Sequence, residues 1–188
     1  MPKTVISLFD YSGNWPSFYK QAGYNVIQVD IKYDLNILEL TKEDFPDNVQ
    51  GVLAAPPCTD FSGSGAQYWK IKDEDGRTAA SLALVDKTLE IISWTKPVWW
   101  ALENPVGRLQ KLRPQLGLPW YFQPHWFGDA YTKKTGLWGT FSRDLPRCDV
   151  IPDPNSWLMK LGGKSEKTKE LRSMTPMGFA ESFYLANP

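Results

Sequence analysis

The N-terminal part of the chain alternates short apolar runs with turn and helix signals. Residues 5–9 form a β-branched and aromatic run that stops at turn-forming residues 10–14. Residues 16–23 combine a proline near the start, apolar side chains on roughly one face and a final glycine, which predicts a short helix. A second apolar run, residues 26–30, ends in Asp30. This order is typical of a Rossmann-like half-domain, in which a ligand lies across the carboxyl ends of the strands.

The same alternation continues beyond this half-domain. Residues 49–55 and 97–102 read as a third and a fourth strand, and apolar residues at helical spacing predict a helix over 77–95 between them. Prolines and tryptophans interrupt residues 113–160, which favours loops and short strands there, and residues 176–186 predict a final helix. We therefore expect an α/β fold with a central, mostly parallel sheet flanked by helices.

Composition limits the organisation and the chemistry of the chain. Its 188 residues fit a single domain over 1–188, and 21 basic and 21 acidic side chains leave contacts with nucleic acid to a local basic surface. Two cysteines and one histidine are too few for a disulfide framework or a four-ligand zinc site, so we expect no metal. The N-terminal apolar run stops at Asp10 and no run has the length that spans a bilayer, which predicts a cytoplasmic protein without membrane contacts.

Three chemistry-bearing segments follow predicted strands. They are residues 9–13, residues 56–65 and Glu103–Asn104, and strand ends of this kind share one edge of the sheet. Cys58 follows two prolines and precedes a glycine- and serine-rich run. A thiol held in a rigid turn suits a nucleophile, whereas the alternative is an ordinary buried cysteine. The loop signals on both sides of Cys58 favour a surface position and hence the nucleophile.

These segments resemble the motifs of the C5-cytosine DNA methyltransferases, which use S-adenosylmethionine (SAM) and a Pro-Pro-Cys nucleophile loop. Leu8–Gly13 is similar to the cofactor loop Phe-x-Gly-x-Gly of that family, and Ala55–Ser62 to its Gly-Pro-Pro-Cys-Gln-x-Phe-Ser loop. Leu102–Pro105 resembles the segment Glu-Asn-Val, and Gly128–Thr135 a degenerate form of Gln-x-Arg-x-Arg. The motifs stand in the family's order across nearly the whole chain, which is also similar to small phage-encoded members.

The resemblance implies a Rossmann-like class I SAM-dependent methyltransferase fold, DNA as the partner and a bacterial or phage-infected host cell as the setting. It implies that Cys58 adds to C6 of cytosine, that Glu103 stabilises the ring at N3 and that Asn104 fixes the loop, so that C5 accepts the methyl group. The target base is expected to be flipped out of the duplex. The implied cofactor contacts are Phe9, Asp10, Ser12, Gly13, Asp30, Ile31, Asp34 and Pro56. The expected nucleic-acid contacts are Ser62, Lys133, Lys134, Lys164, Lys167 and Lys169.

Two departures from the family pattern keep alternatives open. Tyr11 replaces the first glycine of the cofactor loop, and the region left for target recognition, about 139–174, is small. One alternative is a weak or inactive relative that binds SAM or nucleic acid and needs a protein partner for recognition. Another is the same chemistry on RNA, on single-stranded DNA or on a free pyrimidine nucleotide. A nicotinamide dehydrogenase shares the first half-domain but leaves the Pro-Pro-Cys loop unexplained.

Overall fold

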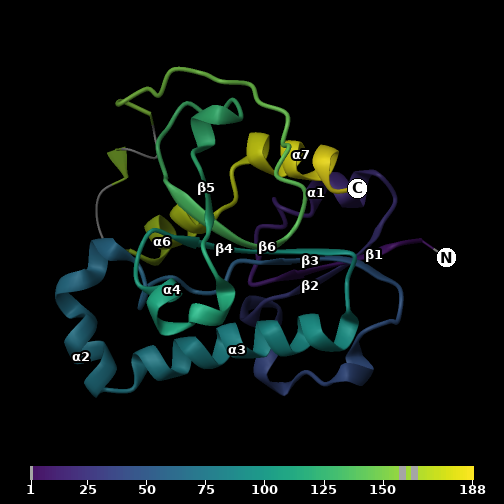
Figure 1. The fold of residues 1–188 in the computed structure, drawn as a ribbon. Helices are drawn as coiled ribbons and strands as arrows, with labels where there is room; N and C mark the ends of the chain where they lie inside the picture. The colour runs from purple at the N-terminus through teal and green to yellow at the C-terminus, as the bar shows by residue number, and fades with distance from the viewer. Residues whose placement is uncertain (1, 157–159, 162–164) are drawn as a thin grey trace.

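A six-stranded, mostly parallel sheet forms the centre of the molecule (Figure 1). The computed structural model describes residues 2–156, 160–161 and 165–188. The sheet order is β2-β1-β3-β4-β6-β5, and the first four of these strands run parallel, whereas β6 is antiparallel to β4 and to β5. The strands are β1 (Thr4–Leu8), β2 (Asn25–Val29), β3 (Val49–Ala54), β4 (Trp99–Pro105), β5 (Trp120–Phe122) and β6 (Thr135–Thr140). This arrangement confirms the predicted fold class.

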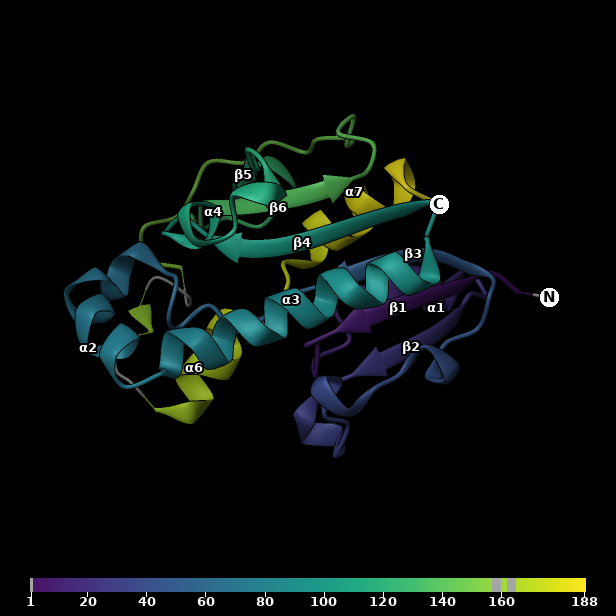
Figure 2. The ribbon, with the colours of Figure 1, turned by 60° about the horizontal axis from the view of Figure 1, so that its bottom comes forward.

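Helices cover both faces of the sheet. The long helix α3 lies along one face, and α1 and α7 lie on the other (Figures 1 and 2). The α-helices are α1 (Ser17–Gln21), α2 (Trp69–Glu74), α3 (Arg77–Thr95), α4 (Leu109–Leu112), α6 (Glu166–Ser173) and α7 (Met177–Ala186). The 3-10 helices are η1 (Ile31–Tyr33), η2 (Ile37–Glu39), η3 (Lys42–Asp44), η4 (Gly63–Tyr68), η5 (Pro114–Leu116) and η6 (Pro124–Trp126). None of the helices in the described ranges has the length and apolarity to cross a membrane.

Alternate residues of the central strands enter two separate cores. Val5 and Leu53 pack in one cluster with Phe179 of α7, whereas Ile6 packs in the other with Val85 of α3. Successive side chains of a strand point to opposite faces, so strands covered on both faces carry continuous apolar runs. This explains why the first three strands were recognisable as unbroken apolar segments.

The fourth strand is longer than its apolar run predicts. The apolar run predicts that this strand ends at residue 102, whereas β4 continues to Pro105. The extension arises because β6 pairs with it, with Glu103 opposite Leu137 and Asn104 opposite Gly136. Glu103 and Asn104 are therefore held on one side by strand pairing with β6, beyond the point where the pairing of β4 with β3 ends, which is a firmer support than a loop after the strand.

Candidate active site

A crevice opens where the strand connections change direction. From β1 the chain first moves outward to β2 and then returns to β3 on the opposite side of β1. Ligands of open α/β sheets bind outside the carboxyl ends of the strands at such a switch point. A cavity of about 300 Å³ lies there. Its wall is formed by Phe9, Asp10, Tyr11, Ser12, Asp30, Lys32 and Ala55 near the strand ends, and by Glu170, Leu171, Ser173, Met174 and Thr175 from α6 and the residues after it.

The loop after β1 is organised by the carboxylate of Asp10. Its Oδ1 accepts hydrogen bonds from Ser12 Oγ at 2.6 Å and from the Gly13 amide at 2.9 Å. Its Oδ2 accepts from the Trp15 amide at 3.3 Å. Phe9 begins the loop with φ 61°, a left-handed conformation that costs a non-glycine residue about 1–3 kcal/mol and concentrates at ligand sites. The carboxylate of Asp10 therefore shapes the loop, and backbone atoms are left to face the cavity.

Asp30 ends β2 at the opposite side of the cavity. Its Oδ1 accepts a hydrogen bond from the Lys32 amide at 2.9 Å, which caps η1. Within the part of the chain that the structure describes, Oδ2 of Asp30 has no hydrogen-bond donor. One oxygen thus holds the local turn, and the other is available to a ligand.

Three chain segments close the cavity beside Asp30. Lys32 Nζ lies 3.0 Å from Glu170 of α6 and 4.5 Å from the ring centre of Tyr11. The Tyr33 hydroxyl donates to the carbonyl of Tyr11 at 2.9 Å. Three of the expected nucleic-acid contacts fall in a basic stretch around residues 160–172. Part of it is helix α6, whose Glu170 borders the cavity.

The remaining predicted cofactor residues lie around this cavity without lining it. Ile31 and Asp34 are exposed on and after η1, and Ile31 is 68% exposed. Gly13 has φ 67°, and an added Cβ there would lie 2.9 Å from Nε2 of Gln28. Pro56 is buried and contributes a carbonyl to the neighbouring strand end. Contacts of these residues with a cofactor stay predictions.

The ends of β3 and β4 bring the predicted catalytic residues together. Asn104 is fully buried, and its Nδ2 donates to the carbonyl of Pro56 at 3.0 Å, which ties β4 to the loop that carries Cys58. The carbonyl of Cys58 accepts from the Phe61 and Ser62 amides at 3.0 and 2.9 Å, so the cysteine begins a tight turn. Cys58 is exposed, whereas Glu103 is only 9% exposed. A thiol and a carboxyl group thus face one edge of the sheet.

Lys133 joins this pair from β6's N-terminal side. Because Thr135 pairs with Pro105, the residues before Thr135 lie just beyond the end of β4. Lys133 Nζ lies 3.7 Å from Oε1 of Glu103, and the Lys133 amide donates to Gln123 Oε1 at 3.0 Å. The antiparallel register of β6 therefore delivers a cation to the catalytic edge.

Burial and this cation set the charge of the site. Burial raises the pKa of Glu103 and favours its protonated form, and the nearby charge of Lys133 opposes the shift. The pKa of the Cys58 thiol is also raised, first by desolvation and then by the charge of Glu103, while Lys133 lowers it. Tyr131, whose pKa is raised by burial and then by Asp129 and Glu103, stands in the same group. The site thus combines a buried carboxyl group, a cation and a thiol.

The predicted nucleic-acid contacts are spread over several surfaces. Ser62 Oγ shares a hydrogen bond of 2.9 Å with Ser64 Oγ, and Lys134 is exposed with its Nζ 4.6 Å from the ring centre of Tyr121. Lys167 is exposed on α6. Lys164 and the side chain of Lys169 lie outside the described residues. Lys133 lies beside Glu103, and all six contacts with nucleic acid stay predictions.

Three residues of this region were not singled out from the sequence. Lys72 and Arg108 are buried charges that hold the Cys58 loop, and Tyr131 lies near Glu103. Charged residues in a short helix or after a strand read as solvated, and their burial depends on partners distant in sequence. For Tyr131 the only available signal was its place in the degenerate motif Gly128–Thr135.

Comparison with known proteins identifies relatives along the chain. The model of the C-5 cytosine-specific DNA methylase family matches residues 18–116. A frog virus 3 (isolate Goorha) protein named "Probable DNA (cytosine-5)-methyltransferase" is 27% identical over 92% of this chain and 94% of its own length. The type II methyltransferase M.NgoPII of Neisseria gonorrhoeae is 25% identical over 57% of this chain and 35% of its own length.

A solved structure has the same fold. It is described as a DNA modification methyltransferase encoded within an E. coli prophage, and it is similar with a TM-score of 0.51 and 19% identity over 87% of this chain. The present chain spans 56% of the length of that prophage protein. The matched family segment contains the strand ends that carry Cys58 and Glu103. Because that family model covers just over half of the 188 residues, the chain belongs to the C-5 cytosine-specific DNA methylase family.

Proposed function

We propose that this protein transfers a methyl group from SAM to C5 of cytosine in DNA through a covalent bond between Cys58 and C6. The observation that carries the proposal is the convergence of Cys58, Glu103 and Lys133 at one edge of the sheet, beside the cavity at the ends of β1 and β2. A nucleophile, a buried acid and a cation are the groups that addition to a pyrimidine ring requires. Family membership supports the choice of cytosine C5.

The cavity residues fit SAM. Ribose hydroxyls are hydrogen-bond donors, and Oδ2 of Asp30 is an acceptor without a donor among the described residues. Apolar wall residues such as Phe9, Leu171 and Met174 suit the adenine and methionine parts. When bound, SAM supplies a methyl group on a positively charged sulfur, which a carbon nucleophile can attack.

The chain's own residues prepare the cytosine for this attack. Cys58 loses its proton to solvent, and its sulfur forms a bond to C6 while the electrons of the C5–C6 double bond shift through the ring to N3. Glu103 donates its proton at N3, which its buried, protonated state favours. Lys133 stabilises the thiolate before addition. After C5 has been methylated, water takes the C5 proton, the electrons of the C5–H bond reform the C5–C6 double bond and expel the Cys58 thiolate, and Glu103 recovers its proton from N3.

The test is methyl transfer from labelled SAM to duplex DNA, with single-stranded DNA, RNA and dCMP assayed in parallel. The purified wild-type chain and Cys58→Ser are compared, and the product is digested to nucleosides. We expect label in 5-methylcytosine from duplex DNA, and a loss of at least about 1000-fold in Cys58→Ser with SAM binding retained. Transfer that survives in the variant contradicts the covalent mechanism, and label only in RNA or dCMP contradicts DNA as the substrate.

A further inference from the structure

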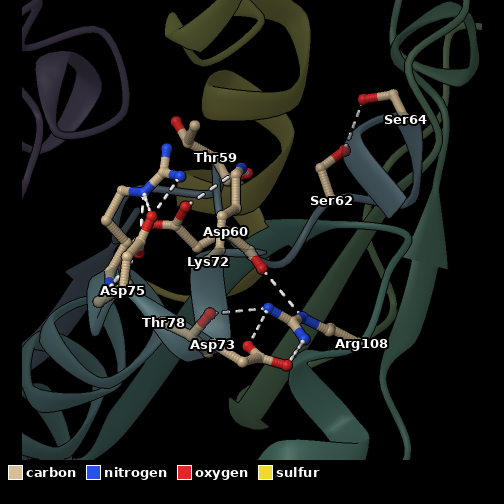
Figure 3. Close-up of polar contacts among 11 residues, drawn as sticks. Thr59, Asp60, Ser62, Ser64, Lys72, Asp73, Asp75, Thr78 and Arg108 are labelled. Carbon is tan, nitrogen blue, oxygen red and sulfur yellow. Dashed lines mark hydrogen bonds and ion pairs between the residues drawn. The ribbon is translucent and has the colours of Figure 1, made fainter. Parts of the chain in front are cut away.

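A buried ion pair lies beneath the loop that carries Cys58 (Figure 3). The side chains of Lys72 and Asp60 are only 7% and 11% exposed, and Lys72 Nζ lies 3.1 Å from Oδ1 of Asp60. Lys72 Nζ also donates to the carbonyl of Thr59 at 2.5 Å, and Ser81 Oγ donates to Oδ2 of Asp60 at 2.6 Å. The two residues that follow Cys58 are thus fixed by side chains of α2 and α3.

Arg108 holds the same loop from the segment that leaves β4. Its Nε donates to the carbonyl of Asp60 at 3.0 Å, and its two terminal nitrogens donate to the carboxylate of Asp73, each at 2.8 Å (Figure 3). One of these nitrogens also donates to Thr78 Oγ1 at 2.8 Å, and the guanidinium carbon lies 4.8 Å from the ring centre of Trp69. All three donor nitrogens of the fork are therefore engaged, which fixes its orientation.

The backbones of the two segments are also in direct contact. The Arg108 amide donates to the Phe61 carbonyl and the Gly63 amide donates to the Val106 carbonyl, each at 2.9 Å. A Cβ at Gly107 would lie 1.9 Å from the Phe61 carbonyl oxygen, so this approach requires glycine. Arg108 follows Glu103 closely in the chain, so these bonds join the segment of the nucleophile to the segment of the acid.

Burying two cations is a costly way to stabilise a loop, because the desolvation of buried ions offsets much of their attraction. Neither Lys72 nor Arg108 lines the cavity, so a direct contact with a ligand in the cavity does not explain their burial. Both instead contact backbone carbonyls within three residues of Cys58. Reactive groups must be held within a fraction of an ångström by surrounding contacts, and a displacement of about 1 Å lowers the rate about 100-fold.

We propose that Lys72 and Arg108 are positioning residues that hold Cys58 at the distance from Glu103 that the reaction requires. This inference rests on the proposed methyl transfer and extends it to residues that do not touch the substrate. The proposal predicts that kcat changes while binding constants do not, because loosening the loop displaces the sulfur of Cys58 and leaves the cavity between β1 and β2 unchanged.

The test uses Cys148→Ser as the background, so that Cys58 is the only cysteine of the full chain. In this background we compare Arg108→Gln with Arg113→Gln, because Arg113 forms a similar two-pronged pair with Asp86, at 2.6 Å on both oxygens, away from the loop. We expect kcat to fall about tenfold to 100-fold in Arg108→Gln, with KM for DNA and Kd for SAM within about twofold of the background. Arg113→Gln is expected to keep kcat within about twofold.

Lys72 needs a charge-balanced variant, because Lys72→Met alone leaves the carboxylate of Asp60 buried without its partner. Lys72→Met/Asp60→Asn removes both charges and keeps an acceptor for Ser81. Lys87→Met is the control, since Lys87 is 14% exposed and pairs with Glu90 at 2.9 Å. The double variant is expected to lower kcat about tenfold, with KM and Kd unchanged.

Alkylation of Cys58 by iodoacetamide gives a readout that is independent of methyl transfer. A loosened loop lets the exposed thiol adopt more orientations toward the reagent, so we expect alkylation to be about threefold faster in Arg108→Gln at a temperature where circular dichroism shows the variant folded. Folded Arg108→Gln with unchanged kcat and unchanged alkylation overturns the proposal. A third outcome is that Arg108→Gln is alkylated faster while the wild-type chain methylates no cytosine substrate. That outcome supports the positioning role and refutes the proposed function.

Discussion

The two loops at the active edge are held in opposite ways. In the loop after β1, Asp10 receives its hydrogen bonds from Ser7, Ser12, Gly13 and Trp15, all within five residues. In the loop after β3, the anchors come from residues that are 13 to 48 positions away, in α2, α3, β4 and the segment after β4. The carboxylate that organises the loop after β1 is thus satisfied locally, and Gln28 and Tyr33 add hydrogen bonds to the loop's carbonyls from farther along the chain. The charged anchors of the Cys58 loop instead come from segments that reach it only when the rest of the domain has assembled.

This difference predicts which loop tolerates damage. A local turn loses only its own hydrogen bonds when its acid is removed. A loop held by buried charges leaves an unpaired ion behind when one partner is removed, and that penalty is larger than the worth of the contact itself.

Asp60→Ala is expected to have the largest effect. It removes the partner of buried Lys72 and the acceptor of Ser81, and we expect the free energy of unfolding to fall by about 3–5 kcal/mol. Urea unfolding followed by circular dichroism measures this change, with Asp75→Ala as the control because Asp75 pairs with Arg77 on the exposed surface. Equal losses in the two variants would show that the Asp60 pair is no stronger than a surface contact.

Glu103→Gln tests the chemistry that the Cys58 loop supports. The substitution removes the proposed proton donor at N3, so we expect kcat to fall about 100-fold with little change in SAM affinity.

The pH dependence of the Glu103→Gln variant gives a second signature. The proposed mechanism requires protonated Glu103 and ionised Cys58, both with raised pKa values, so activity rises with pH as the thiol ionises and falls on the alkaline side of its optimum, where Glu103 is no longer protonated. Glu103→Gln should lose the alkaline fall and level off, and a persistent fall would exclude Glu103 as its origin.

The distinction between local contacts and contacts of residues distant in sequence also decides what the sequence can predict. The strands β1 to β3 and helix α3 follow from apolar runs and helical spacing, and Cys58, Glu103 and Asp30 follow from their places at strand ends. The pairing of β6 with β4, which brings Lys133 to Glu103, has no local signal. The same holds for α6 at the cavity wall, since a lysine-rich stretch gives no sign of the surface that it will cover.

Asp10→Ala tests the local loop and should cost less than Asp60→Ala. Asp10 is 6% exposed and accepts from backbone amides and hydroxyl groups, without a buried cation that would be left unpaired. We expect the free energy of unfolding to fall by about 2 kcal/mol. SAM affinity should fall with it, because Ser12 of this loop lines the cavity. If Asp10→Ala costs as much as Asp60→Ala, the proposed contrast between the two loops is wrong.

Asp30→Asn is expected to have the smallest effect and acts on binding alone. The remaining carbonyl oxygen can still accept from the Lys32 amide, so η1 keeps its cap, while the charged oxygen that faces the ligand is lost. Calorimetry should show SAM binding about tenfold weaker, the loss that one charge-assisted hydrogen bond represents, with unfolding unchanged. Asp153→Asn is the matched control, because Asp153 accepts from the Asn155 amide at 2.8 Å in a similar turn and does not line the cavity. Unchanged SAM affinity in Asp30→Asn would remove Asp30 from the cofactor site. Weaker SAM binding with unchanged stability would show that Asp30 serves binding and not folding. In the Cys58 loop the two cannot be separated in this way, because the residues that position Cys58 also hold the domain together.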